Sequence, residues 1–153
     1  MTPLVSNLWP QFMVDPAFAA CFGQVIVEHA QMLRQERQGI FTLRSGAPLD
    51  KNLCARLLAS LQPDYEGFEL RIQNLFGYAM LDEAALRDLM EEMKRDGVPI
   101  NGFLDRCKIN IIGQKITIGV CHGTKFLQEM HFEKLLAERI AAHTGVTPQV
   151  TLQ

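Results

Sequence analysis

The sequence predicts an α+β protein of two small modules, a β-β-α-β module followed by an α-(short α)-β-β-α-β module. Three observations favour this class. Runs of β-branched residues end at Gly or Pro, apolar residues recur every three or four positions elsewhere, and strands come in neighbouring pairs. Of the 153 residues, 48% are hydrophobic and 21% are charged, a globular composition that can bury a core.

The first module is predicted over residues 20–76, after an irregular tail over residues 1–19 in which prolines recur. Residues 24–29 and 40–44 are rich in β-branched side chains, and the polar stretch between them suits a hairpin. A helix follows, because apolar residues recur at helical spacing at Leu49, Leu53, Leu57, Leu58 and Leu61. Residues 68–73 alternate between apolar and polar, which indicates a half-buried strand.

The second module is predicted over residues 77–153, and it begins with a helix that Asp82 caps. This helix carries on one face Leu86, Leu89, Met90 and Met93. Gly97 ends it, as a glycine just beyond a helix commonly does. A short turn or helix then carries Phe103 and Leu104.

A hairpin, a helix and a last strand complete the second module. Strands over residues 107–112 and 115–120 are joined by Gly113-Gln114, a two-residue connection that suits a type II′ turn. Thr124 is expected to cap one long helix that Gly145 ends, and residues 146–152 are expected to form the last strand.

Charge, motifs and cysteine spacing limit the classes of function that the sequence allows. The net charge of −2 gives no general attraction to phosphate backbones, and no glycine-rich phosphate loop is present. The first residues lack the basic region and apolar run of a signal peptide or membrane span, so we expect a cytoplasmic protein without membrane contact. The four cysteines are far apart and form no C-x-x-C motif, which indicates reduced thiols.

For the residues that could take part in catalysis, a structural role is the better-supported interpretation. The nearest group of carboxylates lies along one helix and fits a solvated face with the i,i+4 pairs Arg87–Glu91 and Glu91–Arg95: Asp82, Glu83, Asp88, Glu91, Glu92 and Asp96. Pairing outward from the hairpin turn sets Cys107 opposite Val120, so Cys121 points to the other face. That geometry argues against a metal shared with His122, and no cofactor or metal site is expected.

The remaining histidines have structural interpretations. His29, His131 and His143 lie in separate predicted elements, and none has an evident acidic partner in the sequence. Each is expected to be a surface or partly buried structural histidine. An enzyme using Cys121 or a carboxylate pair is therefore the least favoured class.

Two sets of residues are candidate contact surfaces. Lys108, Lys115, His122 and Lys125 fall on the hairpin or at a helix start, where they could meet single-stranded nucleic acid or a partner; the alternative is ordinary solvated side chains. Trp9 and Phe12, with Phe18, form an aromatic stretch ahead of the first strand. They either pack onto the first module or bind a partner.

The second half resembles the small KH-like module shared by the N-terminal domain of the replication initiator DnaA and by the N-terminal region of PolC-type bacterial DNA polymerases. The similar features are the helix segment at 86–90, the hairpin over 109–120, the turn at 121–126 and the closing strand. The first half is similar to the strands and helix that precede this module in PolC, at residues 25–27, 39–43, 48–49 and 68–72. DnaA begins with the KH-like module, so the resemblance favours PolC.

The resemblance implies a non-catalytic docking segment of a replicative polymerase. The parent chain would be a DNA-directed DNA polymerase with 3′–5′ exonuclease activity, whose active-site carboxylates would lie beyond Gln153. Expected partners are the rest of that chain and replisome proteins, including the clamp-loader subunit. The alternative is a weak single-stranded DNA platform in the KH-like half, although this chain lacks the G-x-x-G loop with which KH domains grip nucleic acid.

Overall fold

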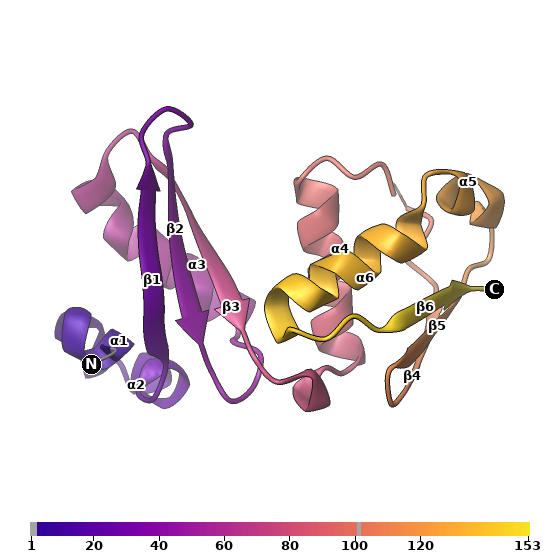
Figure 1. Ribbon diagram of the computed structural model, residues 1–153. Coiled ribbons are helices and arrows are strands. Elements are labelled where there is room, and N and C mark those ends of the chain that lie inside the picture. The colour runs from indigo at the N-terminus through magenta and orange to yellow at the C-terminus, as the bar shows by residue number, and fades with distance from the viewer. Residues whose placement is uncertain (1–2, 101) are drawn as a thin grey trace. The chain divides into compact units, whose positions relative to one another are not determined.

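The computed structural model describes residues 3–100 and 102–153, and the chain divides between Met80 and Leu81 into two compact units. Figure 1 shows that each unit contains one sheet with helices beside it. Both sheets have three strands, ordered β1-β2-β3 in the first unit and β4-β5-β6 in the second. The predicted fold class, α+β in two small modules, is confirmed.

The first unit follows the predicted β-β-α-β order. β1 (Ile26–Leu33) and β2 (Gln38–Arg44) form an antiparallel hairpin. α3 (Lys51–Leu61) and the 3₁₀ turn η2 (Gln62–Tyr65) then lead to β3 (Glu69–Leu75), which pairs parallel to β2. A helix between the two strands is the connection that a parallel pair requires.

The predicted irregular tail is wrong, because residues 5–22 are largely helical. They form α1 (Val5–Leu8), the 3₁₀ helix η1 (Pro10–Val14) and α2 (Pro16–Phe22). Two of the prolines that suggested irregular structure occupy the first position of η1 and of α2, where proline has no hydrogen bond to lose. The Asp15 side chain caps α2 by accepting a hydrogen bond from the Ala17 amide at 2.8 Å.

One hydrophobic core joins these N-terminal helices to α3 and the sheet. Phe41 and Leu43 of β2 are buried, while their neighbours Ile40 and Thr42 are only half-buried, so the core lies on one face of the strand. The helices contribute the buried side chains Val5, Phe18, Phe22, Leu57 and Leu61. The N-terminal helices are thus an integral part of the first unit.

The second unit begins after the 3₁₀ turn η3 (Tyr78–Met80), and α4 (Glu83–Arg95) is its first helix. Asp82 caps α4 through a 2.8 Å bond from the Ala85 amide, and Gly97 has φ +94° beyond its end, as predicted. Residues 102–106 form turns, so the short helix written into the predicted order is absent from this described stretch. Leu104 is buried there.

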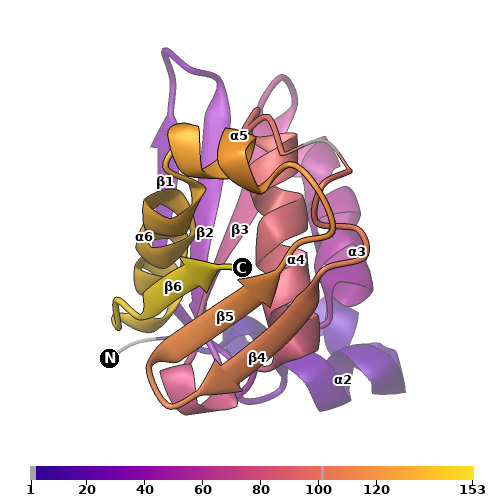
Figure 2. The ribbon, with the colours of Figure 1, turned by 90° about the vertical axis from the view of Figure 1, so that its right-hand side faces the viewer.

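The hairpin has the predicted register. β4 (Lys108–Ile112) and β5 (Lys115–Gly119) are antiparallel, with Lys108 opposite Gly119 and Ile112 opposite Lys115. Of the two turn residues only Gly113 has a positive φ, which is the pattern of a type II′ turn. β6 (Gln149–Leu152) pairs parallel to β5, and Figure 2 shows the three strands side by side.

The predicted long helix after the hairpin is two helices, α5 (Thr124–Glu129) and α6 (Phe132–Thr144). Gly123, with φ +82°, takes the capping position that was predicted for Thr124. The break occurs at His131, whose φ is +60°. Leu127 and Phe132 are both 0% exposed, yet five residues on a straight helix would turn them about 140° apart. The break lets both side chains enter one core.

The core of the second unit also lies on one face of its sheet. Ile116 and Ile118 of β5 and Val150 and Leu152 of β6 are buried, whereas the alternate positions Lys108, Asn110, Ile112, Lys115, Gln149 and Thr151 are exposed. α4 and α6 cover the buried face, contributing Leu86, Met93, Leu136 and Ile140. Within the part of the chain that the structure describes, no helix is long and apolar enough to cross a membrane.

Candidate interaction surfaces

The N-terminal helices of the first unit form a surface almost without charge. Residues 1–27 contain one charged residue, Asp15, and the structure pairs its Oδ2 with Arg56 Nη2 at 2.9 Å. Arg56 also lies over the ring of Phe18, 4.7 Å from its centroid. The Asp15 carboxylate is therefore already paired within the unit. Its pKa is lowered, chiefly by the hydrogen bond from Arg56.

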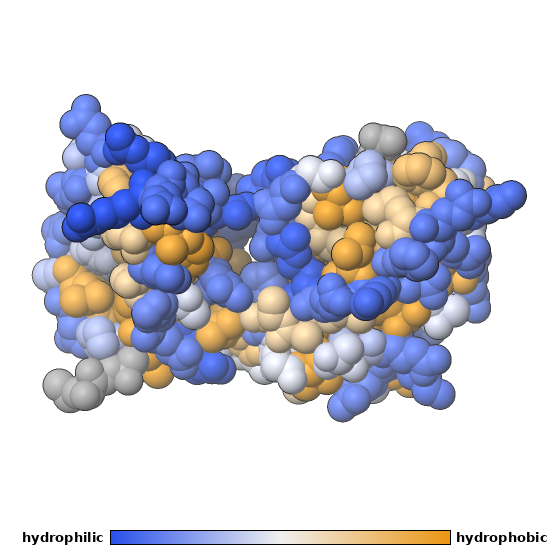
Figure 3. All heavy atoms as spheres, turned by 45° about the horizontal axis from the view of Figure 1, so that its top comes forward, coloured by the Kyte–Doolittle hydropathy of each residue, from blue (hydrophilic) through white to orange (hydrophobic). Residues whose placement is uncertain are grey.

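Apolar side chains reach the solvent on this surface. Leu8 is 46% exposed and Val14 is 85% exposed. The candidate aromatics Trp9 and Phe12 are half-buried: Trp9 meets Phe41 edge-on at 5.5 Å, and Phe12 lies 6.3 Å from Phe18. We define the N-terminal apolar surface as Leu8, Trp9, Phe12, Met13 and Val14. In Figure 3, apolar side chains interrupt the hydrophilic surface of both units.

A second surface lies at one end of the sheet in the second unit, where three aromatic rings meet. The Phe103 ring is 5.5 Å from the His122 ring, at an interplanar angle of 79°, and 5.5 Å from the Phe126 ring, at 55°. Phe126 is 42% exposed, and His122 is also exposed. Phe103 is thus the centre of a cluster whose two outer members face solvent.

Exposed cations adjoin these rings along the chain. Arg106 and Lys108 follow Phe103 in the sequence, and Lys108 is the first residue of β4. Lys125 directly precedes Phe126 on α5. All three are exposed, and none forms an ion pair with the described part of the chain. We define the cationic rim as Phe103, Arg106, Lys108, His122, Lys125 and Phe126.

Three of the four predicted cationic residues lie at the same end of the second sheet. Lys108, His122 and Lys125 belong to the cationic rim, because Lys108 pairs with Gly119 at the end of the hairpin that leads to His122. Lys115 shares the exposed sheet face with Lys108 but lies at the turn end, four residues or about 13 Å along the strand. α5 has only six residues, so its N-terminus adds little dipole.

Sequence reasoning missed Phe103, Arg106 and Phe126 as surface residues. A signal was available in the charge pattern: between Asp105 and Glu129 the sequence contains Arg106, Lys108, Lys115 and Lys125 and no carboxylate. The aromatic contact itself could not be predicted, because Phe103 and His122 are far apart in sequence and belong to different connections of the unit.

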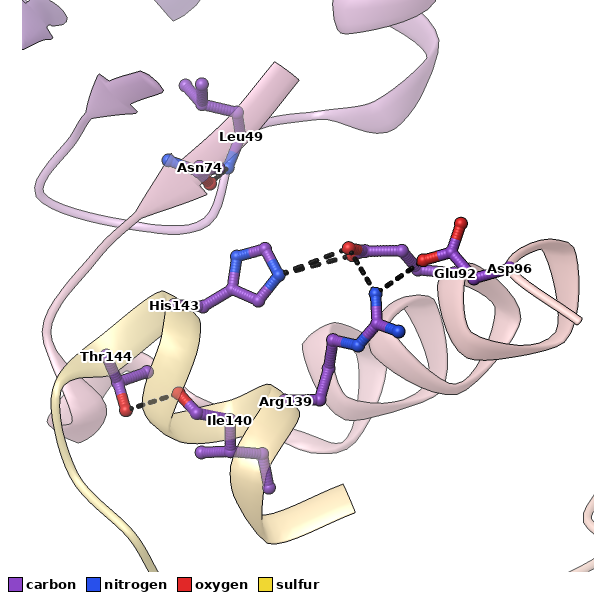
Figure 4. Close-up of polar contacts among 8 residues, drawn as sticks. All are labelled: Leu49, Asn74, Glu92, Asp96, Arg139, Ile140, His143 and Thr144. Atoms are coloured by element: carbon purple, nitrogen blue, oxygen red, sulfur yellow. Dashed lines mark hydrogen bonds and ion pairs between the residues drawn. The ribbon is translucent and has the colours of Figure 1, made fainter. Parts of the chain in front are cut away.

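The prediction of a solvated carboxylate face is wrong for Glu92 and Asp96, which form a partly buried ionic network with α6 (Figure 4). The other four carboxylates, Asp82, Glu83, Asp88 and Glu91, are exposed. Arg139 Nη1 donates to Glu92 Oε1 at 2.9 Å and to Asp96 Oδ2 at 2.7 Å. The buried His143 lies against the same glutamate, with its Nε2 3.3 Å from Glu92 Oε2. His143 therefore has the acidic partner that the sequence did not reveal.

Electrostatics within this network favour the ionised glutamate. Burial raises the Glu92 pKa, but the hydrogen bonds and charges of His143 and Arg139 outweigh burial, and the net pKa is lowered. The network joins two helices of one unit and has hydrogen-bond partners for its charges. The role of the network is therefore structural, because it ties α4 to α6.

The two ion pairs predicted along α4, Arg87–Glu91 and Glu91–Arg95, do not form among the described residues. Arg87 Nη2 binds Glu83 at 2.9 Å and also donates to the Cys107 carbonyl oxygen at 2.8 Å, so it joins α4 to the start of β4 instead of pairing with Glu91. Cys107 is buried and Cys121 is exposed, consistent with opposite faces. Among residues 3–100 and 102–153, no three His, Cys, Asp or Glu side chains are grouped to hold a metal ion.

No protein-family model matches this chain, and no curated protein is found to be similar to it.

Proposed function

We propose that this chain is a docking and positioning segment of a PolC-type replicative polymerase, working in the cytoplasm and holding a replisome protein. The resemblance of the two halves to the PolC N-terminal region supports this proposal, as does the order of elements in each unit. The clamp-loader subunit is the expected partner. The observation that carries the docking role is the N-terminal apolar surface of the first unit.

This surface has the composition of an interface core. Interface cores are depleted in charged residues and enriched in aromatic residues and methionine. Here Trp9, Phe12 and Met13 are half-buried beside the exposed Leu8 and Val14, and the nearby Asp15 is already paired with Arg56. Because Trp9 and Phe12 pack on the core, a partner would meet side chains that are already ordered and would lose little entropy on binding.

The test is a calorimetric titration of the chain with the isolated clamp-loader subunit. Replacing Leu8 and Val14 together by serine should weaken binding about tenfold or more, since exposed apolar anchors at an interface centre carry much of its free energy. Leu8 is about half exposed and Val14 is mostly exposed, so the variant should keep the native circular dichroism spectrum.

The matched control is Ile112→Ser, which removes an apolar side chain that is 68% exposed in the second unit. It should leave the affinity unchanged. Absence of any binding would overturn the docking proposal, and a loss of affinity in Ile112→Ser but not in the double variant would move the interface to the second unit.

A further inference from the structure

The carboxylates and cations of the second unit are segregated along the chain. Six of its ten carboxylates lie between Asp82 and Asp96, on or beside α4, whereas the stretch from Arg106 to Gln128 has four Lys and Arg and no carboxylate. Arg106, Lys108 and Lys125 are exposed and lack ion-pair partners among the described residues. A chain with a net charge of −2 thus presents a local positive potential at one end of its second sheet.

The same end of the sheet exposes aromatic faces. Phe126 is 42% exposed and rests against Phe103, whose other neighbour is the exposed His122. The chain holds these rings in place from two sides: Gly123 approaches the Phe103 ring closely, and buried Leu104 and Leu127 anchor the adjoining residues. Exposed rings fixed by their backbones offer flat apolar surfaces at small entropic cost.

We propose that the cationic rim binds single-stranded nucleic acid, with phosphates contacting Arg106, Lys108 and Lys125 and bases stacking on Phe126 and His122. Proteins that bind single strands without sequence preference combine a positive surface for the backbone with aromatic side chains for the bases. Both parts are present here, because Arg106 and Lys108 follow Phe103 in the sequence and Lys125 precedes Phe126.

The aromatic rings select for unpaired bases. In a duplex the base faces are stacked on one another, so a duplex could use the cations of the rim but not Phe126. An acidic protein segment could likewise use the cations, but stacking requires a planar partner. The rim therefore predicts a preference for single strands over both duplex DNA and polyglutamate.

The test is fluorescence anisotropy of the full chain with a labelled oligothymidylate of about twelve nucleotides, a length within the usual site sizes. Phe126→Ala should weaken binding about tenfold, the usual loss for one stacked base. Lys108→Gln and Lys125→Gln should each lower the slope of log affinity against log salt by about 0.7. Because these side chains are exposed, the variants should retain the native circular dichroism spectrum.

Arg34→Gln is the control, since Arg34 is an exposed cation of the first unit, between β1 and β2. It should bind the oligonucleotide like the unaltered chain. No binding at low salt would overturn the proposal, as would an unchanged affinity in Phe126→Ala. Equal competition by polyglutamate or by duplex DNA would also overturn it, because the surface would then recognise charge alone. The Leu8 and Val14 double variant should bind the oligonucleotide normally, so protein docking and nucleic-acid binding can fail separately.

Discussion

Phe103 lies so close to Gly123 that a Cβ atom on the glycine would be 2.5 Å from Phe103 Cδ1 and 2.8 Å from Cγ. Gly123 also has φ +82°, a conformation that side chains with a Cβ rarely adopt. Two separate requirements, backbone conformation and space for a ring, therefore fix glycine at the position where β5 leads into α5.

Gly123→Ala should lower the free energy of unfolding by about 2–5 kcal/mol, the sum of the left-handed strain and the displacement of the Phe103 ring. It should also weaken oligonucleotide binding, because Phe103 supports Phe126 and His122. Denaturant unfolding and fluorescence anisotropy measure the two effects.

Gly145→Ala separates strain from crowding. Gly145 has φ +76°, but a Cβ there would meet no atom within 4 Å. This variant should lose only about 1–2 kcal/mol of stability from the backbone and should bind the oligonucleotide normally. If the two variants behave alike, contact with the Phe103 ring does not explain the glycine at position 123.

The Glu92 network predicts a dependence of stability on pH. The folded-state pKa of Glu92 lies below its ordinary value of 4.5, so the folded state favours the ionised carboxylate. Its contribution to stability is present above pH 4.5 and is lost as the pH falls through the lower, folded-state pKa. The free energy of unfolding should be insensitive to this group at neutral pH and fall in acid.

Glu92→Gln tests whether Glu92 is the source of this dependence of stability on pH. At neutral pH the variant should lose roughly 1–2 kcal/mol, because an amide makes weaker hydrogen bonds with Arg139 than the carboxylate does. In acid its unfolding free energy should approach that of the unaltered chain. Parallel pH curves for the two proteins would mean that other carboxylates cause the acid loss.

A capping residue in the first unit gives a local test of helix stability. The Asp50 Oδ1 atom accepts hydrogen bonds from the Asn52 amide at 2.8 Å and from the Leu53 amide at 3.0 Å, at the start of α3. Asp50→Ala should cost about 1 kcal/mol and speed hydrogen exchange in the first turn of α3. Asp64→Ala, which removes an exposed carboxylate from η2, should change neither measurement.

Local chemistry was predictable from the sequence. Asp82 is a helix cap and Gly97 follows the end of that helix, and the Gly113 turn sets the register of the hairpin, since each signal lies within a few residues of its effect. The N-terminal helices were missed because proline both interrupts and initiates helices. Composition alone does not separate those two roles.

Long-range contacts were not predictable. Arg139 lies 47 residues from Glu92 and 43 from Asp96, so their network appears only once α4 and α6 pack together. The helix break at His131 has no glycine or proline to announce it, and it accompanies the burial of both Leu127 and Phe132. The sequence predicts only the lysines of the cationic rim. The contact between the Phe103 and His122 rings depends on the fold.

The four cysteines should differ sharply in reactivity, and one of them reports on the cationic rim. Burial raises the pKa of Cys21 and Cys107, and it raises the pKa of Cys54 to about 12, so these three remain protonated at pH values near 8. Cys121 is exposed beside His122 and should react with iodoacetamide at least about tenfold faster than the others. Peptide mass spectrometry over time identifies the order.

Bound oligonucleotide should slow alkylation of Cys121 and leave the other cysteines unaffected, because Cys121 adjoins a ring of the rim. Conversely, a bulky maleimide on Cys121 should block oligonucleotide binding, while Cys121→Ser treated with the same reagent should bind normally. Alkylation of Cys121 at one rate with and without the oligonucleotide would place the bound strand elsewhere on the chain. Rapid alkylation of Cys54 would instead show that α2 and α3 separate readily, since Cys54 is partly buried against the core that they share.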